Sequence, residues 1–88
     1  MVPGSSSSHR RCLELLDHAR TNPGGLRFSE LIRLAECFGF SRRRQKGSHV
    51  VLSLEEALRP LVVQNVKGRA KAYQVRQLLD AIDRTEGS

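Results

Sequence analysis

The stretch Phe40–Leu54, FSRRRQKGSHVVLSL, contains two strand-like segments with a turn signal between them. Residues 40–46 are extended in pattern and basic, Gly47-Ser48 is typical of a tight turn, and residues 49–54 are largely β-branched or aliphatic. The pattern predicts a β-hairpin. Because side chains alternate along a strand, one face should carry Val50, Leu52 and Leu54. The opposite face should carry His49, Val51 and Ser53, which leaves His49 accessible.

The rest of the chain predicts a third strand and three helices. A longer turn at Glu55–Pro60 leads into a strand over Leu61–Val66, which ends at Lys67-Gly68-Arg69. Apolar residues at helical spacing predict helices from Ser8 to Arg20, from Glu30 to Phe38 and from Ala72 onward. The order α-α-β-β-β-α predicts an α+β fold, in which helices cover one face of a three-stranded antiparallel sheet and leave the other face free for a ligand.

Local signals predict where the helices begin and end and which of their side chains face solvent. Ser29 is expected to be the N-cap of the second helix, and Gly39 to end it in a left-handed conformation with Phe40 folded back onto the apolar face. In the last helix, Val75 begins an apolar stripe, and Gln74 is assigned to the solvent side with the neighbouring polar residues.

The length of 88 residues allows one domain and is too short for two. We expect that domain over residues 8–85, with the serine-rich residues 1–7 as a flexible tail. No run approaches the roughly twenty apolar residues that cross a bilayer, and the start lacks the apolar core of a signal peptide. The protein is therefore expected in the cytoplasm, with no membrane partner.

The cysteines and histidines lack metal-site spacing. Cys12 and Cys37 lie at apolar positions of predicted helices, where a free thiol behaves as a small hydrophobe, so both are expected to be reduced core residues. Neither a CxxC nor an HxxxH pair is present to favour zinc. We expect no metal and no cofactor.

The charge points to a polyanionic partner. Fifteen Lys and Arg against nine Asp and Glu give a net charge of +6, which attracts nucleic acid, although charge alone also fits a solvated surface. Position adds information, because Arg42, Arg43, Arg44 and Lys46 surround His49 on the predicted hairpin, and Lys67, Arg69 and Lys71 follow the third strand. The alternative is that the arginines only discourage strand addition at a sheet edge.

Two segments resemble the HicA toxins. Arg43–His49 (RRQKGSH) is similar to the Gly-Ser-His core of that family, and Val66–Leu79 (VKGRAKAYQVRQLL) resembles the stretch that leads into its last helix. The resemblance spans about Leu26 to Ile82. It implies a fold like the double-stranded RNA-binding domain, ribonuclease activity on messenger RNA that inhibits translation, and a HicB-type antitoxin with which the chain would form a hetero-oligomer.

The resemblance also implies which residues act. His49 takes the position of the family's catalytic histidine, with Gly47 and Ser48 as motif residues. One departure is that many members carry a second histidine at the end of the third strand, where this chain has Gln64-Asn65. The residues expected to bind RNA are Arg43, Arg44, Lys46, Gly47, Ser48, Lys67 and Lys71.

The chemistry of metal-free RNA cleavage fits these residue types. A base must remove the proton of the 2′-hydroxyl, and cations must stabilise the charged phosphorane. Histidine is the side chain that changes charge near neutral pH, and Arg44 or Lys46 could bind the phosphate. The general acid is not identified. Two alternatives stay open: a non-catalytic RNA-binding module of the same fold, which would tolerate loss of His49, and a protein-interaction domain whose basic face binds an acidic partner.

Overall fold

A computed structural model describes residues 3–54 and 59–87 of the chain. Its helices are α1 (Pro3–Thr21), the short 3₁₀ helix η1 (Pro23–Gly25), α2 (Phe28–Cys37) and α3 (Ala72–Gly87). Its strands are β1 (Ser41–Lys46), β2 (His49–Ser53) and β3 (Leu61–Gln64). The expected order α-α-β-β-β-α is confirmed. Of the turn expected at Glu55–Pro60, residues 55–58 lie outside the described residues.

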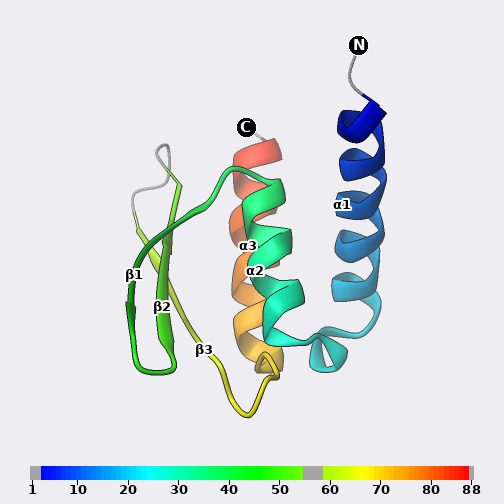
Figure 1. Cartoon of the computed structure of the whole chain (residues 1–88). Helices are drawn as coiled ribbons and strands as arrows, with labels where there is room; N and C mark the ends of the chain where they lie inside the picture. The colour runs from blue at the N-terminus through cyan, green and yellow to red at the C-terminus, as the bar shows by residue number, and fades with distance from the viewer. Residues whose placement is uncertain (1–2, 55–58, 88) are drawn as a thin grey trace.

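The sheet and the helices form separate layers (Figure 1). The strands pair antiparallel in the order β1-β2-β3, and all three long helices lie on one side of this sheet. Helices α2 and α3 are next to the sheet, and α1 packs on them from the far side. The α+β prediction is therefore confirmed, and no helix of the described residues lies on the opposite face of the sheet.

The core lies between the sheet and the helices, because β2 and β3 point alternate side chains into it. Val50, Leu52 and Val63 are almost fully buried, as are Leu34 of α2 and Leu78 of α3. The alternation predicted for β2 is confirmed, since His49 is exposed and its neighbour Val50 is buried. Burial of apolar surface between the two layers is the main force that holds the sheet on the helices.

Helix α2 begins earlier than predicted and ends as predicted. Its N-cap is Arg27, not Ser29, and the carboxylate of Glu30 accepts a 2.9 Å hydrogen bond from the Arg27 N–H. The start is set by tertiary pairing, because the Phe28 N–H donates to the carbonyl of Gly68 at 2.9 Å. At the C-terminus, Gly39 has φ +96° and the Phe40 N–H donates back to the carbonyl of Ala35, which is a Schellman ending.

Helix α1 starts at Pro3, five residues before the boundary expected at Ser8. Proline suits the first turn of a helix because its missing N–H would have no intrahelical partner there, and the serines that follow keep their backbone donors. The strand ends differ from the predictions by one or two residues. Within the described part of the chain, no helix is long and apolar enough to cross a membrane.

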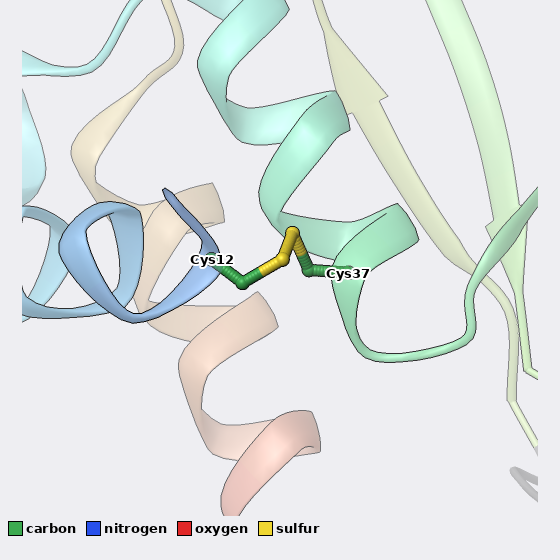
Figure 2. Close-up of a disulfide and its surroundings, with 2 residues drawn as sticks. All are labelled: Cys12 and Cys37. Atoms are coloured by element: carbon green, nitrogen blue, oxygen red, sulfur yellow. A yellow bond between two sulfur atoms is a disulfide. The ribbon is translucent and has the colours of Figure 1, made fainter. Parts of the chain in front are cut away.

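The prediction that the two cysteines are reduced is wrong in this structure. Cys12 of α1 and Cys37 at the end of α2 form a disulfide with a Cα–Cα distance of 5.8 Å (Figure 2). The two helices form an antiparallel hairpin around η1, and both cysteines lie about equally far from its turn. Side chains placed in this way meet when the hairpin closes, although their sequence separation is 25.

The backbone groups at the outer edge of β3 form hydrogen bonds with the side chain of Gln74. The prediction that Gln74 faces solvent is therefore wrong. Gln74 is only 5% exposed. Its Oε1 accepts the Gln64 N–H at 2.9 Å and its Nε2 donates to the Val62 carbonyl at 3.3 Å. Because the backbone groups of an edge strand need partners, this amide from α3 takes the place of a fourth strand. At the other edge of the sheet, all six β1 residues are exposed.

Candidate nucleic-acid interface

The position of His49 follows from the turn that precedes it. Gly47 has φ +59°, whereas Ser48 does not have a positive φ, as in a type II′ turn. Such a turn joins strands with two residues, so Lys46 ends β1 directly opposite His49 at the start of β2. A β-carbon on Gly47 would meet nothing within 4 Å, so the backbone conformation, not space, is what favours glycine here.

Strand register brings four of the polar side chains onto the free face of the sheet. Residues directly opposite in an antiparallel pair share a face, and His49 is opposite both Lys46 of β1 and Gln64 of β3. Arg44 is opposite Val51, which is two residues from His49 on the same face. The free face therefore carries a row of three polar side chains across the strands, Lys46, His49 and Gln64, with Arg44 beside it.

The pairing of His49 with Gln64 is of the closer type. The Gln64 N–H points away from β2, to Gln74, and so does not bond to His49. In such a non-hydrogen-bonded pair the Cα atoms are about 4.5 Å apart and the side chains approach more closely than in a bonded pair. The amide of Gln64 is therefore a near neighbour of the imidazole on the free face.

The three consecutive arginines point in different directions because β1 contains a bulge. The register shifts between Arg42 and Arg44, so Arg43 has no residue opposite it. Arg42 is opposite the buried Leu52 and faces the helices, where its Nε lies 3.6 Å from a carboxylate oxygen of Glu36. Of the basic run expected to surround His49, Arg44 and Lys46 share its face, Arg43 lies at the edge, and Arg42 does not join them.

Lys67 and Lys71 lie beyond the sheet, at the end where the Gly47-Ser48 turn is found. Lys67 and Gly68 both have positive φ, +52° and +83°, and form a second tight turn. Asn65 ties this turn to the first one, because its N–H donates to the Ser48 carbonyl at 2.8 Å and its Oδ1 accepts the Gly68 N–H at 2.6 Å. Lys71 precedes α3, and its Nζ lies 5.8 Å from the centre of the Tyr73 ring.

Apolar side chains adjoin the polar row. Val62 of β3 is opposite Val51 on the free face, and 49% of Val62 is exposed although valine is usually buried. The face thus combines cations, one imidazole and an apolar surface, all presented by rigid strands. Such a surface can hold a phosphate next to a proton acceptor while a base or sugar contacts the valines.

The described residues contain no group of three or more His, Cys, Asp or Glu placed to hold a metal ion. Asp80 pairs with Arg84 on α3, and Glu55 and Glu56 lie outside the described residues. On the free face, the imidazole of His49 can accept or donate a proton, and the cations of Lys46 and Arg44 can stabilise a negative charge. Gln64 is opposite His49 in the sheet. The sequence points to Gln64 only because many HicA toxins have a second histidine where this chain has Gln64-Asn65.

A model of a known protein family matches most of the chain. The profile of a family described as HicA toxin of bacterial toxin-antitoxin systems matches residues 28–83. The match begins at the first residue of α2, includes the whole sheet and His49, and ends within α3, so α1 lies outside it. No curated protein and no solved structure matches the chain.

Proposed function

This chain belongs to the HicA family of toxins from bacterial toxin–antitoxin systems, and on that premise we propose that it is an endoribonuclease that cleaves messenger RNA and inhibits translation. The proposal also assigns the base to His49 and needs no metal ion. The observation that carries it is the row on the free face of the sheet formed by exposed Lys46, exposed His49 and half-buried Gln64.

In the proposed reaction, the neutral imidazole of His49 removes the proton of an RNA 2′-hydroxyl. The 2′-oxygen forms a bond to the adjacent phosphorus, and the bond from phosphorus to the 5′-oxygen breaks. Lys46 and Arg44 stabilise the extra negative charge of the phosphorane, Lys46 as a point charge and Arg44 through its planar fork. The departing 5′-oxygen takes a proton from solvent, to which this exposed face is open.

Gln64 has a supporting role in this proposal. Its amide can donate a hydrogen bond to a phosphate oxygen and accept one from a sugar hydroxyl, but it cannot shuttle a proton at neutral pH. The family resemblance would favour a second histidine at this position. In this chain Gln64 therefore helps to position RNA, and His49 is the only one of the two residues that transfers a proton. Gln64→Ala should raise KM more than it lowers kcat.

The proposed partner is a HicB-type antitoxin that covers the free face. The exposed cations of β1 produce a positive field that would attract an acidic surface and raise the association rate. A partner placed over His49 and Val62 would bury the apolar surface and block RNA without any change of conformation. The stoichiometric complex should be inactive, and its β1 and β2 amides should be protected from hydrogen exchange.

The decisive experiment compares purified wild type, His49→Ala and the control His18→Ala on a long RNA in EDTA. His18 lies on α1, far from the free face, so its variant should cleave as wild type does. Loss of general-base catalysis should lower the rate of His49→Ala by about 100- to 10,000-fold. RNA binding without cleavage by wild type would instead favour the alternative of a non-catalytic RNA-binding module.

A further inference from the structure

A second basic surface lies on the side of α2, away from the free face. It is a groove of about 690 Å³ whose walls come from α1, α2, β1 and the turn before α3. Four of the residues that line it are arginines: Arg11, Arg27, Arg33 and Arg42. The residues that the sequence predicts to bind RNA do not line this groove.

The charges in the groove are only partly neutralised. Its two carboxylates both interact with residues of the groove itself, since Glu36 pairs with Arg42 and Glu30 accepts the backbone N–H of Arg27 at the start of α2. No carboxylate pairs with Arg11, Arg27 or Arg33 in the described residues. The first turn of α2 also lines the groove, and a helix N-terminus adds partial positive charge. Among the described residues, the groove therefore has four arginines against two glutamates, and three of these arginines have no carboxylate partner.

The groove adjoins the free face at both ends of the hairpin. Arg42 lines the groove and Arg44 is on the free face, and the bulged Arg43 lies between them in the chain. At the other end, Asn65 lines the groove and donates its N–H to Ser48, the residue before His49. Short stretches of chain with basic or polar residues thus connect the free face with the groove.

We propose that this groove binds the phosphate backbone of the RNA strand that His49 cleaves, at nucleotides outside the cleavage site. The proposal rests on the proposed function for the identity of the strand. Guanidinium groups bind phosphate in a planar, bidentate geometry, and the half-buried Phe28 in the same groove offers a surface for a base. Arg11 belongs to α1 and lies outside residues 28–83, which the family model matches.

The test uses full-length His49→Ala protein, so that RNA stays intact, and measures its affinity for a long single-stranded RNA over a range of salt concentrations. Arg11→Gln/Arg33→Gln is compared with Arg76→Gln, which removes an exposed arginine of α3 outside the groove. If each groove arginine contacts one phosphate, the double variant should lower the salt slope by about 1.4 and weaken binding about 25-fold at 0.1 M salt. Arg76→Gln should have neither effect.

The same variants, made in protein that keeps His49, distinguish this inference from the proposed function. Groove contacts away from the scissile bond should raise KM and leave kcat unchanged. If Arg11→Gln/Arg33→Gln binds and cleaves RNA as Arg76→Gln does, the groove inference is wrong and the proposed ribonuclease stands. If wild type cleaves no RNA while the groove variants still weaken RNA binding, the inference holds and the proposed ribonuclease fails.

Discussion

Reduction of the Cys12–Cys37 disulfide should lower the stability of the domain without changing its fold. The bond joins α1 to α2 and closes a loop with a sequence separation of 25. In the chain-entropy description, a cross-link over such a loop restricts the unfolded chain and contributes about 3.5 kcal/mol. For a domain of this size, each kcal/mol moves Tm by about 4–8 °C, so reduction should lower Tm by roughly 14–28 °C.

The structure also predicts where the reduced protein loosens. Leu15 and Ala19 are buried, and Arg20 pairs with Asp83 of α3, so the second half of α1 keeps its attachment without the disulfide. Of these contacts, the disulfide is the one that lies nearest the N-terminus of α1. Amide exchange should therefore rise in the first half of α1 and change little in α2.

The assay is thermal unfolding followed by circular dichroism on wild type, on wild type with dithiothreitol and on Cys12→Ser/Cys37→Ser. The two samples without the bond should melt at similar temperatures, well below oxidised wild type. Non-reducing mass spectrometry supplies the control, since the oxidised chain is lighter by two hydrogens. Equal Tm values for chains shown to be oxidised and reduced would refute the reasoning, as would two free thiols in protein kept under oxidising conditions.

Three further predictions concern single side chains. Gln74→Ala leaves the Gln64 N–H and the Val62 carbonyl without their partner, so it should cost about 1–3 kcal/mol in chemical denaturation, whereas exposed Gln77→Ala should change stability little. Gly47→Val places a β-branched residue at φ +59° and should destabilise the hairpin by at least about 1 kcal/mol, with cleavage lost as His49 moves; equal stability and activity would contradict the turn assignment. The hydrogen bond from Arg20 lowers the pKa of Asp83, so this pair stabilises the fold above the ordinary carboxyl pKa and the contribution disappears as the pH falls through the lowered value. Asp83→Asn should therefore weaken the acid dependence of stability, and an unchanged pH profile would exclude the pair as a contributor.

The sequence contained enough information for the fold and for the faces of the hairpin. Alternation in residues 49–54 separates Val50 from His49, and the structure buries the first and exposes the second. Glycine at positions 39 and 47 predicted a helix end and a tight turn, and both have positive φ. These features depend on residues close in sequence, which is why local patterns predict them.

The errors came from contacts between distant segments. The start of α2 is fixed by a hydrogen bond from Phe28 to Gly68, forty residues away along the chain, so the local N-cap signal at Ser29 did not decide it. Likewise, the bulge that turns Arg42 toward Glu36 depends on pairing with β2 and has no glycine to mark it.

Two errors could have been avoided with signals present in the sequence. Gln74 lies four residues before Leu78 and therefore on the apolar stripe of α3, where a buried polar group needs partners. Cys12 and Cys37 are equally distant from the Gly24-Gly25 turn, and an antiparallel helix hairpin brings such positions together. Both inferences depend on how the helices pack in the folded domain. The apolar pattern of a single helix does not contain that information.

The ends of the RNA fragments test the assignment of His49 most directly. If His49 removes the proton of the 2′-hydroxyl, wild type in EDTA should leave a 2′,3′-cyclic phosphate on one fragment and a 5′-hydroxyl on the other. A substrate with a 2′-deoxy sugar at the cleavage site should remain intact, and His49→Ala should yield neither end. Fragments with a 3′-hydroxyl and a 5′-phosphate, or cleavage of the 2′-deoxy substrate, would contradict the account.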